Sequence, residues 1–339
     1  MDERYSRQIL FEGIGEEGQR RIREARVTIV GCGALGSAQV EMLARAGVGH
    51  LRIADRDFVE ESNLQRQTMF TEQDARERMP KAAAAARRVA EINSDVRVEA
   101  EVVDVNNSNV ERLIEGRDVV LDATDNFTTR FLLNDACVKH GVAWVYGAAV
   151  GSYGVMMTVR PHATPCLRCV FPEVPAAGSA PTCDTAGVIM PIILMVAAVQ
   201  VSEALKLVTG QVENLHASLM QFDVWQNDWR RISLGERAPD CPACALGRFD
   251  SLAAESGELA AVLCGRDAVQ VSPRTAARLD LEALAARLRA VGEVKVNPYL
   301  VRLRAGAYEL TVFADARAII RGTDDAATAR TLYARYVGN

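Results

Sequence analysis

The chain has 339 residues, and 49% of them are hydrophobic, which is enough for one large domain with a sizeable core and a second, small one. The formal net charge of -5 argues against nucleic acid as the main partner. The polar N-terminus lacks the apolar segment of a signal peptide, and the longest apolar run, residues 187–201, is short for a membrane span and contains Pro191. We therefore predict a cytoplasmic protein without nucleic-acid or membrane partners.

A strand, a glycine-rich turn and a helix follow one another from residue 26 to residue 46. The turn reads G-x-G-x-x-G, with Gly31, Gly33 and Gly36, and such glycines let the backbone turn tightly and approach a phosphate. The helix that follows presents free N–H groups to an anion. A second strand ends at Asp55, 19 residues after Gly36, where a carboxylate can bind ribose hydroxyls. This order predicts a nucleotide-binding unit of the α/β class.

Polar side chains are crowded into the 13 residues from Asp55 to Gln67, which also include Asp57, Asn63 and Arg66. When a nucleoside triphosphate is cleaved, negative charge shifts toward the leaving phosphates and must be neutralised. This set of polar and charged side chains can neutralise it. A dehydrogenase with a nicotinamide cofactor has no evident need for so many polar groups here. A solvated polar loop is the other alternative. The crowding favours a triphosphate.

One basic and one acidic residue further along the chain, Lys81 and Asp125, are placed where they could contact that triphosphate. Lys81 opens an alanine-rich helix, where a lysine is unfavourable unless an anion is bound; an exposed lysine is the alternative. Asp125 follows the strand at residues 119–121, at a carboxyl end where a carboxylate can bind Mg²⁺. A helix cap is the alternative role for this segment. Asp122 or Asn126 can cap the helix that comes next, so that Asp125 remains available for Mg²⁺.

Four of the eight cysteines form two CxxC pairs, Cys166 with Cys169 and Cys241 with Cys244. Two such pairs are typical of a structural zinc site with four thiolate ligands. The 71 residues between the pairs exceed a compact zinc ribbon, so the metal would join two distant loops. Redox-active dithiols are the alternative, but neither pair opens a helix after a thioredoxin-like start. A closed site of this kind stabilises a fold and leaves no position for catalysis.

Cys183 and Arg7 are ambiguous when their local sequence alone is considered. Cys183 lies in a loop rich in proline, glycine, serine and alanine, residues 172–187, just before an apolar helix. A thiol at a helix N-terminus is readily ionised and nucleophilic, and an inert cysteine is the alternative. Arg7 has the features of a surface cation.

The last part of the chain forms a separate module in our interpretation. Residues 247–254 are a plausible linker, and strands alternate with two helices after it. We predict two domains, residues 1–248 and residues 249–339, the second a small α+β module to which the sequence assigns no chemistry. A module of ~80 residues is near the lower limit for folding alone.

Eight motifs stand in the same order as in one known family. They are R-Y-S-R-Q, G-C-G-A-L-G, D-R-D-F-V-E-x-S-N-L-Q-R-Q, the helix at Lys81, D-A-T-D-N, C-L-R-C-V-F-P, C-x-x-A-G-V and C-P-A-C. On these motifs the chain resembles the ThiF/MoeB/HesA adenylyltransferases, the prokaryotic relatives of the ubiquitin-activating enzymes. The resemblance covers roughly residues 4–247. It implies a Rossmann-like ATP-binding domain with a mixed sheet and a Cys₄ zinc site.

The resemblance also implies an activity. Such an enzyme uses ATP and Mg²⁺ to adenylate the C-terminal glycine of a ubiquitin-like sulfur-carrier protein that ends in Gly-Gly, and it releases pyrophosphate. The acyl adenylate then receives sulfur, from Cys183 or from a persulfide donor protein, for thiamine or molybdopterin biosynthesis. Members of the family are homodimers.

Residue roles follow from the same resemblance, position by position. Arg7 corresponds to an arginine that reaches the triphosphate of the other subunit, Cys183 to a cysteine that links to the activated carrier, and Asp125 to the magnesium ligand. The zinc ligands correspond to Cys166, Cys169, Cys241 and Cys244. We expect catalysis to depend on Arg7, Arg66, Lys81, Asp125 and Cys183. We expect nucleotide contacts from Gly31, Gly33, Gly36, Asp55, Asp57, Asn63, Arg66, Gln67, Lys81, Asp125 and Asn126.

The chain departs from the family pattern in three places. Ala34 stands where a further glycine is common, Met79 and Pro80 replace a glycine-bearing approach to Lys81, and the C-terminal module does not resemble a rhodanese domain. Three alternatives to the carrier-activating enzyme remain open. They are an adenylating dehydratase that acts on a modified tRNA base, a nicotinamide-dependent dehydrogenase, and a zinc-stabilised scaffold that binds a carrier without turnover.

Overall fold

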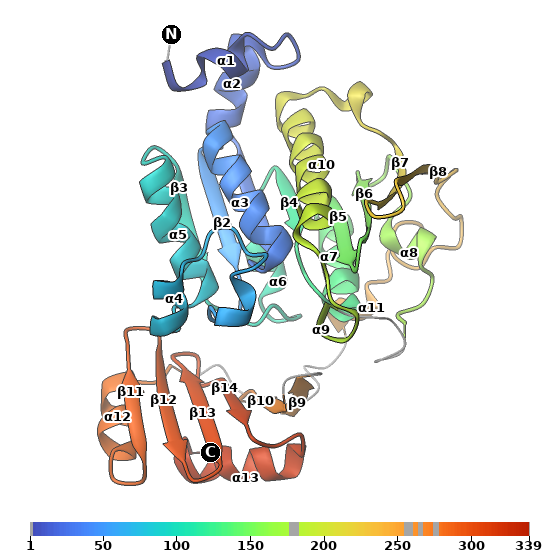
Figure 1. The fold of residues 1–339 in the computed structure, drawn as a ribbon. Coiled ribbons are helices and arrows are strands. Elements are labelled where there is room, and N and C mark those ends of the chain that lie inside the picture. The colour runs from blue at the N-terminus through green and yellow to red at the C-terminus, as the bar shows by residue number, and fades with distance from the viewer. Residues whose placement is uncertain (1–2, 176–182, 254–259, 264–266, 274–277, 339) are drawn as a thin grey trace. The chain divides into compact units, whose positions relative to one another are not determined.

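The structure is a computed structural model that describes residues 3–175, 183–253, 260–263, 267–273 and 278–338 (Figure 1). The chain divides into two compact units, residues 1–254 and residues 255–339.

The first unit is built on an eight-stranded sheet with the order β3-β2-β1-β4-β5-β6-β7-β8. The strands from β3 to β5 are parallel, and those from β5 to β8 pair antiparallel, so the sheet is mixed, as predicted. The strands are β1 (Arg26–Val30), β2 (His50–Ala54), β3 (Arg97–Glu101), β4 (Val119–Asp122), β5 (Ala143–Val150), β6 (Tyr153–Val159), β7 (Ser218–Asp223) and β8 (Asp228–Ser233).

Helices cover both faces of this sheet. The helices α3 (Ala34–Ala46), α5 (Lys81–Ile92) and α10 (Met190–Thr209) share one apolar core with it, and α6 (Val110–Ile114) and α7 (Phe127–His140) share another (Figure 1). The central strands β1 and β4 are buried on both faces, which explains their nearly continuous apolar sequence. The other helical elements of this unit are η1 (Glu3–Tyr5), α1 (Ser6–Ile9), α2 (Gly15–Glu24), η2 (Glu61–Asn63), α4 (Glu72–Glu77), α8 (Leu167–Val170), α9 (Cys183–Ala186), η3 (Val212–Asn214) and α11 (Asp250–Ala253).

The helix α10 is the most apolar in the part of the chain that the structure describes. It has 20 residues, and an 18-residue window in it reaches a mean hydropathy of 1.8, so by length and composition it could cross a membrane. In this fold it packs against α3, β5 and β6. The buried side chain of Gln200, on its inner face, donates hydrogen bonds to the carbonyl oxygens of Asp122 (2.8 Å) and Val145 (3.0 Å). The helix thereby holds the carboxyl end of β4 and the adjacent part of β5.

The second unit contains a six-stranded antiparallel sheet with the order β11-β12-β13-β14-β10-β9. Two helices, α12 (Leu281–Leu288) and α13 (Ala326–Tyr336), share its apolar core. The sequence predicted both helices, the strands β10, β12, β13 and β14, and a strand-like run at the position of β9, but not β11. The strands are β9 (Ala260–Leu263), β10 (Ala268–Val271), β11 (Glu293–Val296), β12 (Leu300–Ala305), β13 (Tyr308–Phe313) and β14 (Ala318–Arg321).

Candidate active site and metal site

The strand order of the sheet reverses between β1 and β4, which are parallel neighbours. From β1 the chain moves outward to β2 and β3, and it then returns to place β4 on the other side of β1. Ligands of open parallel sheets bind beyond the carboxyl ends of the strands at such a reversal. The glycine turn follows β1, Asp55 follows β2, and Asp125 follows β4, so the topology brings these three segments to one crevice.

Each glycine of the turn has a different steric reason to be glycine. Gly31 has φ +91°, and a Cβ there would lie 2.5 Å from the carbonyl oxygen of Ala123. A Cβ on Gly36 would lie 2.1 Å from the carbonyl oxygen of Gly31. Gly33 has room for a Cβ, whose nearest neighbour would be Nε2 of Gln67 at 3.9 Å. Gly33 also caps α3 without any side-chain hydrogen bond, so this helix end can present its N–H groups to a phosphate.

These contacts give opposite expectations for two alanine substitutions. Gly36→Ala should lower the free energy of unfolding by about 2 kcal/mol or more, because its methyl group meets backbone that cannot move aside. Gly33→Ala should leave stability nearly unchanged but weaken ATP binding, because the methyl group points toward the phosphate position. Thermal unfolding and ATP titration of both variants test this. A Gly36→Ala variant as stable as the wild type would contradict the loop geometry.

The carboxylate of Asp55 joins the end of β2 to the glycine turn. Its Oδ2 accepts a hydrogen bond from the backbone N–H of Cys32 at 2.5 Å, and its Oδ1 accepts one from the N–H of Asp57 at 2.6 Å. Burial raises the pKa of Asp55, the nearby ammonium of Lys81 lowers it, and the net direction is upward. Each carboxylate oxygen can accept a second hydrogen bond, so Asp55 can still bind ribose hydroxyls.

Lys81 is buried, which excludes the alternative of an exposed lysine. Its side chain is 5% exposed, and its Nζ lies 3.2 Å from Oδ2 of Asp57. The backbone N–H of Lys81 also donates to the carbonyl oxygen of Asp57, at 2.9 Å. The start of α5 is thus fixed to the segment after β2, with the ammonium group beside the carboxylates of the crevice.

The residues from Asn63 to Gln67 have different surroundings. The side chain of Asn63 accepts a hydrogen bond from the N–H of Glu60 and closes a capping box, and Arg66 donates to the carbonyl oxygen of Ser62 at 2.9 Å. Gln67 is 4% exposed, and its Oε1 has no hydrogen-bond partner in the described part of the chain. A buried acceptor without a partner is costly, so Gln67 is suited to contact a ligand beside Gly33.

The structure separates the roles of three polar residues at the carboxyl end of β4, Asp122, Asp125 and Asn126. Oδ1 of Asn126 accepts a hydrogen bond from the N–H of Thr129 at 2.8 Å, so Asn126 caps α7. Asp122 is fully buried and lies 3.3 Å from Nε of Arg130, a residue that the sequence analysis did not single out. Asp125 is exposed, and its Oδ1 accepts a hydrogen bond from Asn126 at 3.2 Å. An exposed carboxylate at a strand end suits Mg²⁺, which keeps several waters and takes one or two carboxylates.

Arg7 does not belong to the crevice of its own chain. It is exposed on α1, and the neighbouring Gln8 donates to the carbonyl oxygen of Ala46 at 2.9 Å, at the far end of α3. The glycine turn lies at the beginning of α3, about 18 Å away along this helix at ~1.5 Å per residue. Cys183 begins α9, and its side chain lies outside the described part of the structure.

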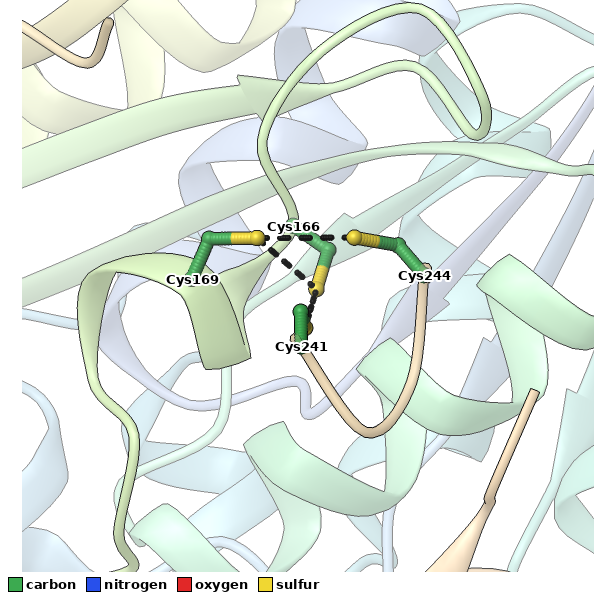
Figure 2. Close-up of side chains that lie close together, drawn as sticks. All are labelled: Cys166, Cys169, Cys241 and Cys244. Atoms are coloured by element: carbon green, nitrogen blue, oxygen red, sulfur yellow. Dashed lines mark hydrogen bonds between the residues drawn. The ribbon is translucent and has the colours of Figure 1, made fainter. Parts of the chain in front are cut away.

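The two CxxC pairs come together in space, as Figure 2 shows. The Sγ atoms are 3.5 Å apart for Cys166 and Cys241 and 3.4 Å apart for Cys169 and Cys244, and all four lie within 4.8 Å of one another. Four thiolates around zinc at about 2.3 Å place their sulfurs about 3.8 Å apart. Burial and the neighbouring Cys169 and Cys241 raise the pKa of the Cys166 thiol to about 12, so this thiol is protonated unless a metal binds it. The donor set and its spacing fit Zn²⁺.

The helix α7 anchors the first cysteine loop and also α11, and these contacts were not predicted from the sequence. Oδ1 of Asn134 in α7 accepts a hydrogen bond from the N–H of Leu167 at 2.8 Å, and the buried carboxylate of Asp135 pairs with Arg168 at 2.9 Å. Oδ2 of Asp135 also accepts from the N–H of Ser251 at 3.0 Å. Ser251 lies in α11, within the stretch predicted to be a linker. The contact with α7 explains why a helix forms there.

Comparisons with known proteins agree with this architecture. Residues 5–243 match the ThiF family. The chain is 49% identical over 340 residues to the sulfur carrier protein ThiS adenylyltransferase of Bacillus subtilis, with 100% of both chains covered. It is 42% identical over 250 residues to the SAMP-activating enzyme E1 of Haloferax volcanii, covering 74% of this chain and 91% of that one. A crystal structure of Escherichia coli MccB shares the fold, with a TM-score of 0.64 at 22% identity, and covers 72% of this chain and 75% of that one.

Polar strand ends gathered at a strand-order reversal, together with a cluster of four cysteines that could hold zinc, are features of an α/β nucleotide-binding enzyme. The chain belongs to the ThiF family of adenylyltransferases. The family, the fold class and the enzyme class predicted from the sequence are therefore confirmed. The full-length match further shows that the Bacillus subtilis protein extends over the C-terminal unit, beyond the ThiF match that ends at residue 243.

Proposed function

We propose that this protein uses MgATP to adenylate the C-terminal glycine of a ubiquitin-like sulfur carrier of the ThiS type, in the cytoplasm, as a step toward a thiocarboxylate. The observation that carries the proposal is the 49% identity to a ThiS adenylyltransferase over the whole chain. The crevice supports it, because the phosphate-binding turn, the ribose-binding acid and the exposed Asp125 all lie at the same strand ends.

In this reaction an oxygen of the carrier carboxylate bonds to the α-phosphorus of ATP, the bond to the β-phosphate oxygen breaks, and pyrophosphate leaves. No general base is needed, because the carboxylate is already ionised. The N–H groups at the start of α3 would bind the phosphates, while Arg66 and Lys81 would offset the added negative charge. Asp125 would hold Mg²⁺, which supplies charge neutralisation at the triphosphate.

Lys81 enters the reaction already desolvated. Its ammonium group is held beside Asp57 at 3.2 Å in a largely buried position. A triphosphate oxygen that approaches this group meets a fixed cation in a medium of low dielectric constant, where the attraction is much stronger than in water. Little reorganisation is then needed as charge shifts toward the leaving pyrophosphate.

The test is ATP–pyrophosphate exchange in the presence of Mg²⁺, with and without a small carrier protein that ends in Gly-Gly. We expect exchange only when the carrier is present. Exchange that fails with every ThiS-type carrier, together with tRNA binding, would favour the dehydratase alternative. Binding of NAD(H) with no need for magnesium would favour the dehydrogenase, and carrier binding without exchange would favour the scaffold.

We further propose that the active protein is a homodimer in which Arg7 completes the crevice of the partner. Arg7 lies far from its own glycine turn, so a single chain does not supply this cation to its own triphosphate. Equal amounts of Arg7→Ala and Asp125→Ala chains, unfolded and refolded together, should recover about a quarter of the wild-type exchange rate, because half of the dimers regain one intact site. A mixture that stays inactive would show that Arg7 does not act across the dimer.

Cys183 is proposed to act after adenylation, as the thiol that links to the activated carrier or exchanges with a persulfide donor protein. Cys183→Ala should then retain ATP–pyrophosphate exchange and lose thiocarboxylate formation, measured as a mass increase of the carrier. Full thiocarboxylate formation by this variant would remove Cys183 from the reaction and leave the external donor as the sulfur source.

A further inference from the structure

An arginine–aspartate pair lies across the neighbouring strand ends, next to the ribose-binding acid. Arg56 stands between Asp55 and Asp57, and its Nη1 lies 3.2 Å from Oδ1 of Asp104, in the turn after β3. The two side chains are 32% and 30% exposed, so the pair borders solvent rather than the core. Such a half-exposed ion pair contributes little to stability, about 1 kcal/mol or less, and its position therefore suggests another use.

The turn that carries Asp104 is held rigidly. The carbonyl oxygen of Asp104 accepts hydrogen bonds from Nδ2 of Asn106 (3.1 Å) and Nδ2 of Asn109 (2.8 Å). Oδ1 of Asn109 in turn accepts from the N–H of Asn106 at 2.9 Å. The backbone at residue 104 therefore has a fixed place in the turn after β3, and from there the carboxylate pairs with the guanidinium group of Arg56.

The course of a bound nucleotide brings its base to this pair. The phosphates belong at the glycine turn after β1 and the ribose at Asp55 after β2, so the base continues outward in the strand order β1-β2-β3. Burial opposes the charge of Arg56, but the carboxylates of Asp104, Asp57 and Asp125 outweigh it and raise its pKa. The guanidinium thus remains charged and is held between the ends of β2 and β3.

We infer that Arg56 and Asp104 select adenine, an inference that rests on the proposed use of ATP. The planar guanidinium group of Arg56 lies against the face of the base, a contact that arginine makes readily with aromatic rings. The carboxylate of Asp104 accepts a hydrogen bond from the 6-amino group, since the two oxygens of a carboxylate offer about four acceptor positions in all. Guanine and hypoxanthine carry an oxygen at position 6, and this acceptor would face a second acceptor.

The test measures equilibrium binding of ATP, ITP and GTP to the full-length protein with Mg²⁺ by calorimetry, and KM and kcat for each nucleotide in pyrophosphate exchange. We expect the wild type to bind ATP at least ~10-fold more tightly than ITP or GTP. Asp104→Asn can donate to an oxygen at position 6, so it should reduce this preference to about threefold or less. Arg56→Met should raise KM for all three nucleotides with little change in kcat, and Arg56→Lys should show a smaller rise because it keeps only the charge.

A matched control is Glu101→Gln, which alters another carboxylate near the end of β3. Glu101 pairs with Arg112 of α6 at 2.7 Å, and this variant should keep the ATP preference of the wild type. Equal binding of ATP and ITP by the wild type would overturn the inference without any variant, as would an unchanged preference in folded Asp104→Asn. Neither result touches the proposed function. Failure of the wild type to bind ATP at all would instead refute that function, and the adenine inference with it.

Discussion

Asp125→Ala should abolish adenylation of the carrier and leave the fold intact. Asp125 is exposed at the carboxyl end of β4, and the helix cap beside it is supplied by Asn126 instead. Removing the carboxylate therefore costs about 0.5 kcal/mol of stability or less. It removes the group proposed to hold Mg²⁺ on the triphosphate, and loss of one preorganised electrostatic contact in a transition state costs ~3 kcal/mol or more, a rate loss of ~100-fold or more. We expect a loss of similar size for Arg66→Ala.

The matched control for this prediction is Asp95→Ala. Asp95 is also an exposed aspartate, but it precedes β3 and so lies at the amino ends of the parallel strands, away from the crevice. Exchange rates at saturating and at low MgCl₂ separate a magnesium ligand from a residue that binds ATP alone, because loss of a metal ligand is partly offset by higher magnesium. An Asp125→Ala enzyme with more than a tenth of the wild-type rate would exclude Asp125 as the main ligand.

The sequence predicted those parts of the site whose constraints are local. Only glycine fits at Gly31 and Gly36, because neighbouring backbone fills the space of any side chain, and this requirement is visible as a spacing pattern. The alternation of apolar strands and helices likewise predicted the α/β class. The CxxC pairs were recognisable because metal geometry restricts both residue type and spacing.

The long-range polar contacts could not be predicted in this way. Asp135 and Arg168 are 33 positions apart, and nothing in the residues around them distinguishes a buried ion pair from two surface charges. The same holds for Asp122 with Arg130 and for Gln200 with the backbone of Asp122 and Val145. The strand β11 was missed for a related reason, since its alternating exposed Glu293 and Lys295 leave a weak apolar signal. Only the fold brings such residues to their partners.

Loss of the metal should destabilise the first unit substantially. The four sulfurs join loops 75 positions apart, and α7 holds the first loop through Asn134 and the segment after the second loop through Asp135. Structural zinc contributes ~10 kcal/mol or more to the folding of small zinc-dependent peptides. A unit with large apolar cores keeps part of its stability, so we expect a loss of at least ~3 kcal/mol, or roughly a 10 °C decrease in Tm, after treatment with a strong chelator.

Cysteine variants test the same prediction without a chelator. Cys169→Ala should lower both the zinc content and the Tm, and Cys169 is the most suitable ligand because it is less buried than the other three. Cys137→Ala is the control: this thiol is fully buried in α7 but lies outside the cluster, so the variant should leave a small cavity and retain one zinc ion per chain. The prediction is wrong if Cys169→Ala retains stoichiometric zinc, or if metal removal leaves the Tm unchanged. Because a closed four-thiolate site has no free coordination position, the chelated protein should lose exchange activity only as it unfolds.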